Sequence, residues 1–379
     1  MSPRPRDPHA VFSGDIFLQQ ARGGVSRYFA ELQRELGVLG ISGTIATPLW
    51  ITEYLESGDG IDGFRIPQPL MRFGLRPLSK KMIGRVESNV LRRLHKSGAN
   101  VVLHRTNYTT RPSVPRVPHV LTVYDMIFEN HPAWFNGIED RILAKRMALE
   151  SADQIIAISD YTRDQLLDRY SIEPNRVTTV PLAARYIDPR LSSLRELSKA
   201  PPFILYVGTR HGYKNFERLV RACSQSAAFR DGLRLIAFGG GSATGDELKL
   251  LAHVGLMKQV TFAAGPDDQL AAHYAAAVAL VYPSLDEGFG LPPIEAMLYG
   301  CPILAASAGA MPEVLGDAVA YADPLDVDSW ADGIDGLVFD EAHRLKLGIL
   351  GRSQAGSYSW ANTAAATLGV YREALGAFS

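Results

Sequence analysis

The sequence predicts an α/β protein of two doubly wound domains, each a parallel sheet with helices on both faces. Three observations lead to this fold class. The chain has 379 residues, enough for two domains of about 100–200 residues each. Short apolar runs alternate with helical patterns almost throughout, which is typical of βαβ units. The alternation breaks once, in a polar stretch that ends in Pro201-Pro202, and we interpret that stretch as a linker.

The composition is that of an ordinary globular protein, with 46% hydrophobic and 21% charged residues. A formal net charge of -1 provides no general basic field for nucleic acid. Cys223 and Cys301 stand in no metal or redox motif, so we expect reduced thiols in a cytosolic protein. No apolar run approaches the ~20 residues of a membrane span, and none follows the basic N-terminus as in a signal peptide.

The first domain is expected at residues 1–186. Its first strand lies at 10–17, and the glycine turn Gly23-Gly24 then starts an amphipathic helix that ends near Leu36. The alternation continues to the end of the domain. It predicts further strands at 43–47, 101–103, 119–123 and 154–158, and helices at 139–151 and 160–170.

One stretch of this domain, Met71–Lys96, is basic and amphipathic. Its cations stand among Leu, Met and Val, a pattern that can lie on an anionic membrane surface. We favour a solvated helix face or a loop, and peripheral membrane contact remains the alternative. The cations are Arg72, Arg76, Lys80, Lys81, Arg85, Arg92, Arg93 and Lys96.

The linker at 187–202 leads to a second domain at 203–356, and a terminal helix is expected within 357–379. The second domain repeats the alternation. It predicts strands at 203–207, 233–238, 260–262, 279–282 and 302–305, and helices at 215–223, 246–254, 266–277 and 292–299. Ligands of open α/β sheets bind beyond the carboxyl ends of the strands, so residues that directly follow strands are the site candidates.

The strongest motif is E-G-F-G-L-P-P-I-E at 287–295, shortly after the strand that ends at Tyr282. Pro292-Pro293 suits the first turn of a helix, where missing N–H groups cost little. Backbone N–H groups of the preceding loop would lie at the positive helix end, which suits a diphosphate. The binding candidates of this loop are Gly288, Phe289, Gly290 and Leu291.

Two carboxylates, Glu287 and Glu295, flank this predicted phosphate site. Phosphate binding explains them poorly, because like charges repel. A ligand that carries hydroxyl groups on both sides of its phosphates explains them well, since carboxylates accept hydrogen bonds from sugar hydroxyls. The alternative for Glu295 alone is that it interacts with the dipole of its own helix.

A second motif, V-G-T-R-H-G-Y-K-N at 207–215, also follows a strand. Arg210 and Lys214 would neutralise a pyrophosphate leaving group, and Gly208 would let the backbone approach the donor. The alternative is an ordinary solvated loop. No Asp-x-Asp motif ends a strand, since Asp326 and Asp328 lie in a late polar stretch, so we expect no metal and no other cofactor.

Weaker candidates follow other strands. The turn Gly23-Gly24 and the run that starts at Gly239 allow close approach to a ligand, but neither makes a dinucleotide fingerprint. His104 and Asp125 each follow a strand and are expected to face the cleft. His104 is a candidate proton carrier, with a structural histidine as the commoner alternative. We therefore include both as catalytic candidates.

Together these motifs resemble those of the retaining glycosyltransferase family GT4, which has the GT-B fold. The segment 287–296 resembles the family's E-x7-E element, and 208–215 resembles its phosphate-binding loop. I-S-D-Y-T at 158–162 and G-G-V-S-R-Y at 23–28 also look familial. The resemblance covers nearly the whole chain. It implies two Rossmann-like domains that face a cleft, with the terminal helix crossing back to the first domain.

The resemblance also implies roles for the candidates. Glu287 would contact the hydroxyl groups of the transferred sugar, and Glu295 would bind the nucleotide ribose. Arg210 and Lys214 would bind the diphosphate.

Further roles rest on the same resemblance. Gly23-Gly24 would close over the donor, and residues 262–270 would help to hold the base. The chain departs from the family in two places. Tyr213 precedes Lys214 where many relatives have an arginine, and Tyr124-Asp125 stands where many have His-Asp. The second departure leaves Asp125 or His104 to steer the acceptor.

The function that we expect is transfer of a hexosyl group from a nucleoside diphosphate sugar to a glycan or lipid-linked acceptor, with retention, in polysaccharide or O-antigen-type synthesis. GDP, UDP and dTDP donors all remain open, and mannosyl transfer is favoured by its frequency in the family. The alternatives are a sugar-nucleotide epimerase or phosphorylase of the same fold, or a non-catalytic nucleotide- or glycan-binding protein. We expect a cytoplasmic protein, with peripheral contact at the inner membrane face left open.

Overall fold

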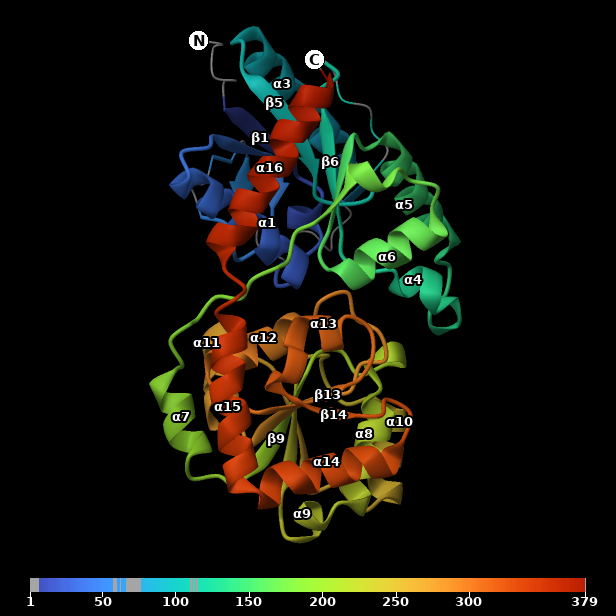
Figure 1. Cartoon of the computed structure of the whole chain (residues 1–379), viewed down its shortest axis with the longest axis vertical. Helices are drawn as coiled ribbons and strands as arrows, with labels where there is room; N and C mark the ends of the chain where they lie inside the picture. Colours follow the sequence, from blue (N-terminus) through green and yellow to red (C-terminus); the bar gives the residue numbers. More distant parts are fainter. Residues whose placement is uncertain are drawn as a thin grey trace. The chain divides into compact units, whose positions relative to one another are not determined.

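The computed structural model describes residues 7–56, 60, 61, 63–65, 76–109, 111, 113 and 115–378, without the side chains of 64, 76–81 and 378. The chain divides into two compact units, shown in Figure 1. Unit 1 comprises residues 1–129, 135–182 and 360–379, and unit 2 comprises 130–134 and 183–359. Each unit is therefore assembled from separate stretches of sequence.

Unit 1 contains a six-stranded sheet of order β2-β1-β5-β6-β7-β8, in which every pair is parallel. Its central strands are buried apolar runs, as expected for a sheet covered on both faces. A short parallel pair, β3 (Leu49–Trp50) and β4 (Phe64–Arg65), lies outside this sheet. The six strands are β1 (Pro8–Ser13), β2 (Gly43–Ala46), β5 (Asn100–Arg105), β6 (His119–Val123), β7 (Gln154–Ala157) and β8 (Val177–Thr179).

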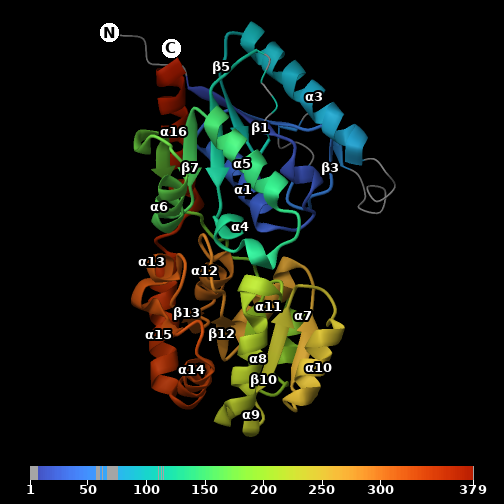
Figure 2. The ribbon, with the colours of Figure 1, turned by 90° about the vertical axis from the view of Figure 1, so that its right-hand side faces the viewer.

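The C-terminal helix completes unit 1. Tyr28, Phe29, Leu32 and Leu36 recur at helical spacing on α1 and are buried. Helix α16 packs on α1 and on four strands of the sheet, as Figures 1 and 2 show from two sides. The predicted return of the terminal helix to the first domain is thus confirmed. The helices of this unit are α1 (Gly24–Val38), α3 (Arg76–Lys96), α4 (Ile127–Asn130), α5 (Glu139–Ser151), α6 (Asp160–Arg169) and α16 (Trp360–Phe378).

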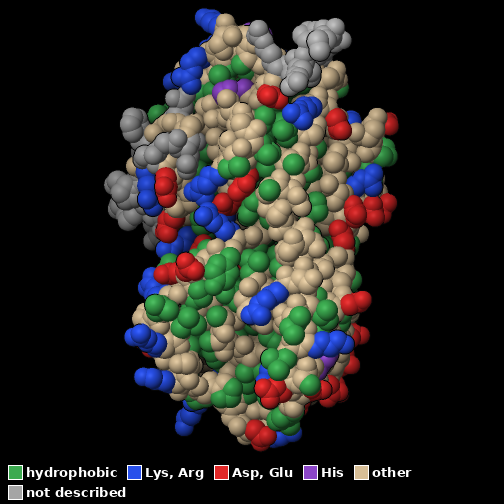
Figure 3. Space-filling model, turned by 60° about the vertical axis from the view of Figure 1, so that its left-hand side comes forward, with side chains coloured by type: hydrophobic (Ala, Val, Ile, Leu, Met, Phe, Trp, Pro, Cys, Tyr) green, Lys and Arg blue, Asp and Glu red, His purple; other side chains and the backbone are tan. Residues whose placement is uncertain are grey.

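Unit 2 repeats the design with a parallel sheet of order β11-β10-β9-β12-β13-β14. Its largest core cluster lies between the sheet and α8 and α14, and it includes the fully buried Trp330 and Phe216. On the face shown in Figure 3, apolar side chains gather mainly over this unit. The strands are β9 (Phe203–Val207), β10 (Arg234–Phe238), β11 (Val260–Ala263), β12 (Ala279–Tyr282), β13 (Ile303–Ala306) and β14 (Ala320–Ala322).

The helices of unit 2 connect these strands on both faces of the sheet, as in other doubly wound domains. Together with unit 1 they confirm the predicted fold class of two parallel six-stranded sheets with flanking helices. They are α7 (Leu191–Leu197), α8 (Phe216–Gln225), α9 (Ala227–Arg230), α10 (Gly245–His253), α11 (Asp267–Ala276), α12 (Leu291–Leu298), α13 (Met311–Leu315), α14 (Val327–Phe339) and α15 (Glu341–Ala355).

The boundary between the units differs from the predicted one. The second stretch of unit 1 ends at residue 182, unit 2 continues from residue 183, and unit 1 resumes at 360. The polar stretch 187–202 is not a free linker. It contains α7, which packs on α11, and Arg190 pairs with Asp268 at 2.8 Å. This short helix has no buried residues, so it leaves no periodic apolar pattern in the sequence.

The basic stretch Met71–Lys96 corresponds largely to α3. Residues 71–75, with Arg72, lie outside the described residues, as do the side chains of Arg76, Lys80 and Lys81. In the described part, Ile83, Val90 and Leu91 are buried, while Arg85, Arg92, Arg93 and Lys96 are exposed. This part is thus a helix with an apolar side against the domain and a basic side in solvent. No helix of the described residues is long and apolar enough to cross a membrane.

Candidate functional site

The sheet of unit 2 has its topological switch point between β9 and β12. The chain runs outward from β9 to β10 and β11 on one side, and then returns to start β12 on the other side. The carboxyl ends of such a neighbouring pair form the usual ligand crevice of an open α/β sheet. The loops after these two strands are the predicted phosphate loop and the E-G-F-G-L-P-P-I-E motif.

The two loops bring Lys214 and Glu287 together. Lys214 ends the 3-10 helix Gly212–Lys214, and its Nζ lies 2.5 Å from Oε1 of Glu287. The two side chains keep 13% and 11% of their surface exposed. The ammonium also lies over the rings of Tyr213 and Tyr282, at 5.0 and 5.5 Å from their centroids. An ion pair that is partly open to solvent therefore stands at the switch point, where a ligand can exchange partners with it.

The surroundings of this pair have a low polarity. Burial raises the pKa of the Tyr282 hydroxyl well above its usual range, and the negative charge of Glu287 adds to that shift. Burial, with Glu287 as a second cause, also raises the pKa of Tyr206. Both hydroxyls therefore stay protonated near neutral pH. Charges in such a site interact more strongly than in water.

The loop that follows Glu287 leads directly into α12. Gly290 takes a left-handed conformation (φ 85°) at the N-cap, and proline occupies the first helical positions. No side chain caps this helix end. Pro292 and Pro293 carry no N–H, which leaves Leu291 and Ile294 as the backbone donors of the first turn. Phe289, like Gly288 and Gly290, is buried, and its ring packs against that of Tyr358 with centroids 5.2 Å apart. The other predicted loop residues lie beside Phe289. Gly288 and Gly290 precede α12, and Leu291 is its first residue.

Glu295 lies in the second turn of α12 and is buried. The hydroxyl of Tyr274, on α11, donates a hydrogen bond to Oε2 of Glu295 at 3.0 Å. The ring of Tyr274 is stacked on that of Tyr299, with centroids 5.8 Å apart. The orientation of Glu295 is thus fixed by a neighbouring helix. We missed Tyr274 in the sequence, because a tyrosine at helical spacing is indistinguishable from a core residue.

Arg210 is paired within the protein. Its guanidinium donates to Oε1 of Glu247 at 2.8 Å and to Gly239 O at 2.6 Å, and further bonds reach the carbonyls of 240–242. It also lies 4.7 Å from the centroid of the Phe262 ring. In this arrangement Arg210 holds the glycine run 239–241, whose three residues all have positive φ. The diphosphate role predicted for Arg210 therefore requires these bonds to open.

Asp286, beside Glu287, has partners that the sequence analysis missed. Asn130 Nδ2 and His131 Nε2 each lie 3.0 Å from Oδ2 of Asp286. The His131 ring stacks on Trp134 with centroids 4.1 Å apart. These residues come from the short segment 130–134, which is part of unit 2. The sequence does not indicate this contact, because Asn130 and His131 are far from Asp286 along the chain. What the sequence shows there is a cluster of polar and aromatic residues between two helices.

The candidates of unit 1 occupy different environments. Gly23 is extended and precedes α1, which Gly24 begins. Asp125 follows β6 and is half-buried, with Oδ1 accepting from the Ile127 N–H at 3.1 Å. Lys145 Nζ donates to the Asp125 carbonyl at 2.6 Å and pairs with Glu129 at 3.0 Å. A buried ion pair thus fixes the backbone at Asp125.

His104 does not face an open site, and this prediction is wrong. Its side chain has no exposed surface. Its ring nitrogens lie 2.8 Å from the hydroxyls of Tyr371 and Thr122. Burial lowers the pKa of His104 to about 3, so the ring is neutral near pH 7. It is a core residue that ties β5 to α16, because its side chain points into the layer beneath the C-terminal helix.

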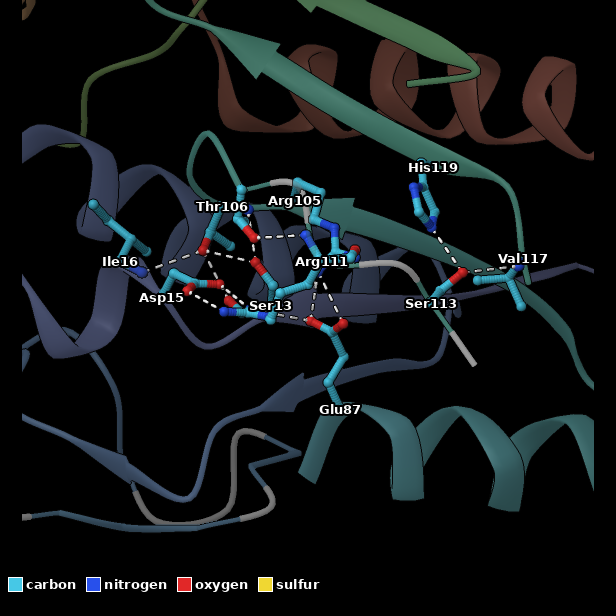
Figure 4. Close-up of polar contacts among 11 residues, drawn as sticks. Ser13, Asp15, Ile16, Glu87, Arg105, Thr106, Arg111, Ser113, Val117 and His119 are labelled. Carbon is cyan, nitrogen blue, oxygen red and sulfur yellow. Dashed lines mark hydrogen bonds and ion pairs between the residues drawn. The ribbon is translucent and has the colours of Figure 1, made fainter. Parts of the chain in front are cut away.

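Unit 1 has its own switch point, between β1 and β5, and Figure 4 shows the polar cluster there. Arg105 makes two bonds of 2.9 and 2.8 Å to Glu87 on α3. Arg111 makes two bonds of 2.9 and 2.6 Å to Asp15. Burial raises the pKa of Glu87, against the opposing effect of the two guanidinium groups. Two cations and two anions thus neutralise each other in this cluster.

Comparison with known proteins agrees with this architecture. Residues 193–354 match the family of glycosyl transferases group 1, and residues 22–184 match Glycosyltransferase Family 4. O-antigen chain mannosyltransferase B of Escherichia coli is 33% identical over 67% of this chain and 70% of that protein. The chain belongs to the group 1, family 4 glycosyltransferases.

Solved structures show the same fold as this family 4 glycosyltransferase. Sucrose-phosphate synthase from Thermosynechococcus elongatus has a TM-score of 0.75, with 21% identity, over 99% of this chain and 100% of that one. HepE of Anabaena, in complex with UDP and glucose, has a TM-score of 0.68, with 17% identity, over 96% and 100% of the two chains. These likenesses establish a GT-B architecture.

A cavity of about 1180 Å³ lies beside the predicted site. Arg210, His211 and Gly240 line one side of it, and α8 and α10 line the other. Lys214, Glu287 and Glu295 do not line it. Among the described residues there is also no group of three His, Cys, Asp or Glu side chains arranged to hold a metal. Both cysteines are free and buried, as expected from the sequence.

Proposed function

We propose that the enzyme transfers a hexosyl group from a nucleoside diphosphate sugar to a hydroxyl of a glycan or lipid-linked acceptor, with retention at the anomeric carbon. The observation that carries this proposal is the Lys214–Glu287 pair at the switch point of unit 2. A cation at this place suits the leaving diphosphate, and a carboxylate suits the hydroxyl groups of a sugar. A nucleotide sugar brings both groups to one site.

Different residues of unit 2 bind different parts of the donor. Lys214 and the N–H groups at the start of α12 receive the diphosphate, whose charge increases as the bond to the sugar breaks. Glu287 accepts hydrogen bonds from the sugar. Glu295, oriented by Tyr274, accepts them from the ribose. Arg210 joins the diphosphate when it exchanges Glu247 for the ligand, and otherwise keeps the glycine run in place.

The reaction that we propose is a substitution on one face of the sugar. The bond between the anomeric carbon and the diphosphate oxygen breaks, and its electron pair stays on the diphosphate. The acceptor oxygen then bonds to the anomeric carbon, and its proton passes to the departing diphosphate. The protein contributes position and charge rather than a covalent step. No metal is required, because Lys214 and the helix end supply the positive charge. Asp125 is the remaining candidate for orienting the acceptor.

Donor and acceptor are assigned from the relatives. The Escherichia coli relative is a mannosyltransferase of the O-antigen chain, so a mannosyl donor and a growing surface polysaccharide are the first choice. A UDP donor is the second, since HepE was solved with UDP and glucose. We place the reaction in the cytoplasm, with α3 as the element to test for contact with a membrane.

The test is a donor screen followed by two substitutions. GDP, UDP and dTDP are compared by the thermal stability that each confers on the protein, because a ligand of the folded state raises it. Lys214→Ala and Glu287→Ala are then assayed with the matching nucleotide sugar. Loss of a preorganised charge lowers kcat by about 100–1000-fold in comparable sites. Full turnover in both variants would exclude the site.

Two matched controls are available in unit 2. Lys346 and Glu341 are exposed on α15 and do not line the cavity beside the site. Lys346→Ala and Glu341→Ala remove the same charges and should leave kcat and donor KM unchanged. Binding of the donor without sugar transfer to any acceptor fraction would instead support a non-catalytic binding protein.

A further inference from the structure

Asn215, the residue after Lys214, has an unusual backbone. Its φ of 57° and ψ of 25° are left-handed, and it is the one non-glycine residue with positive φ in the described part of the chain. This conformation is unfavourable for residues with a Cβ, although asparagine tolerates it better than most. Such a conformation persists only where the surroundings determine it, and it concentrates at functional sites.

Hydrogen bonds of the Asn215 side chain account for this backbone conformation. Nδ2 donates to Pro283 O at 3.0 Å and to Pro324 O at 2.8 Å. Oδ1 accepts from Arg218, and the residue is buried. Pro283 directly follows β12, at the start of the loop that carries Glu287. One carboxamide thus joins the Lys214 loop to the Glu287 loop.

A second bond joins the same two loops. The N–H of Leu285 donates to Tyr213 O at 2.7 Å. In the first loop the two bonds flank Lys214, at Tyr213 and Asn215. In the second loop both bonds, at Pro283 and Leu285, come shortly before Glu287. The left-handed turn at Asn215 lets the chain enter α8 at once, while Lys214 stays directed toward Glu287.

We propose that Asn215 is a positioning residue for catalysis, which acts through Lys214 by fixing its ammonium opposite Glu287. This inference rests on the proposed function of that pair. Asn215 itself contacts no reacting atom. Its backbone sets the direction of Lys214, and its carboxamide sets the distance between the two loops. Sugar-nucleotide transfer then depends on a residue that binds neither sugar nor nucleotide.

Three substitutions separate the two contributions. Asn215→Gly keeps the left-handed backbone but removes the carboxamide. Asn215→Asp keeps the shape but replaces the Nδ2 donor with an oxygen that faces two carbonyls. Asn215→Ala removes the carboxamide and disfavours the backbone. We expect kcat to fall about 10-fold for Gly and about 100-fold for Asp and Ala, because a small misplacement of a catalytic group costs about that much. Donor KM should change by less than about 3-fold.

The assay uses the nucleotide sugar that the wild type turns over in the donor screen, and it is run well below the melting temperature of each variant. Release of the nucleoside diphosphate is measured per folded protein. Asn175, which is exposed in unit 1, provides Asn175→Ala as the matched control. If Asn215→Ala does not fold, the Gly and Asp variants still decide the question.

A double-mutant cycle tests the route of the effect. If Asn215 acts through Lys214, then Lys214→Ala combined with Asn215→Asp should have the kcat of Lys214→Ala alone, because the two losses share one cause. A merely structural Asn215 would lower the melting temperature but leave kcat at the wild-type value, or give losses that multiply in the double variant. Either result overturns the inference. Full turnover in Lys214→Ala would instead overturn the proposed function.

Discussion

The Arg105–Glu87 and Lys214–Glu287 ion pairs, at the switch points of the two units, carry similar charges but differ in their exposure to solvent. In unit 1, Arg105 and Glu87 keep only 4% and 2% of their side-chain surface exposed. In unit 2, Lys214 and Glu287 keep 13% and 11% exposed. The first pair belongs to a cluster in which every charge has an opposite partner. Beside this cluster, hydrogen bonds between Ser13 and Thr106 link the carboxyl ends of β1 and β5.

Under the proposed function, this difference distinguishes a stabilising ion pair from a ligand-binding ion pair in one architecture. A buried pair is fixed by its surroundings, and loss of one partner leaves an isolated charge in a medium of low polarity. A pair that solvent reaches can exchange its partner for a ligand. The comparison predicts that polar substitutions at the strand ends of unit 1 affect mainly stability, whereas those of unit 2 affect mainly donor binding or turnover.

The largest expected effect concerns His104 of unit 1. Its folded pKa of about 3 lies below the ordinary value of 6.5. The unfolded chain therefore binds a proton that the folded chain does not, as pH falls from 6.5 to about 3. His104 thus contributes stability that is present above pH 6.5 and is lost toward pH 3, by about 5 kcal/mol in total.

The measurement is the free energy of unfolding as a function of pH. His104→Gln should reduce its slope between pH 6 and 4 relative to the wild type. His253 is exposed on α10, so His253→Gln should leave the slope unchanged. Equal slopes for His104→Gln and the wild type would contradict the buried position of the ring.

The next effect is expected at the ion-pair cluster in Figure 4. Arg105→Met leaves Glu87 buried without its closest cation, which should lower the free energy of unfolding by about 3–5 kcal/mol. Urea denaturation measures this loss. Replacing both partners, as Arg105→Met with Glu87→Met, should recover most of it, because no isolated charge remains. Nucleotide binding by the folded protein should stay unchanged in both variants. A loss of nucleotide affinity would contradict the predicted difference between the two units.

The smallest effect tests the unit 2 side of the comparison. Tyr274→Phe removes the hydrogen bond to Glu295, worth about 1 kcal/mol. The affinity for the nucleoside diphosphate that stabilises the wild type should fall about 5-fold, and less for its 2′-deoxy analogue. Calorimetry measures both. Tyr321→Phe, which removes hydroxyl bonds to backbone carbonyls elsewhere in unit 2, should not change them. An equal loss for both nucleotides would argue against a ribose role for Glu295.

The sequence predicted the alternation of strands and helices, because buried parallel strands and amphipathic helices leave periodic local patterns. It also identified the two loops that bring Lys214 and Glu287 together, because each loop follows a strand. It failed where a contact joins distant segments. Tyr274 and His131 reach the site from elsewhere in the chain, and His104 turns toward α16 rather than the open edge. The short strands β8 and β14 were missed because three residues show no period.

The return of α16 to unit 1 has a consequence for synthesis on the ribosome. Tyr371 of this helix completes the core around His104, and Thr363 donates to Pro181 O at 2.8 Å. Unit 1 therefore lacks part of its interior until residues 360–379 emerge, whereas all but a five-residue segment of unit 2 is made as one continuous stretch. Unit 2 can thus fold before α16, which completes unit 1, has been synthesised. A fragment of residues 1–182 would expose the surface that α16 covers. A stop codon just before α16 would therefore destabilise unit 1, most of which lies in the first half of the sequence.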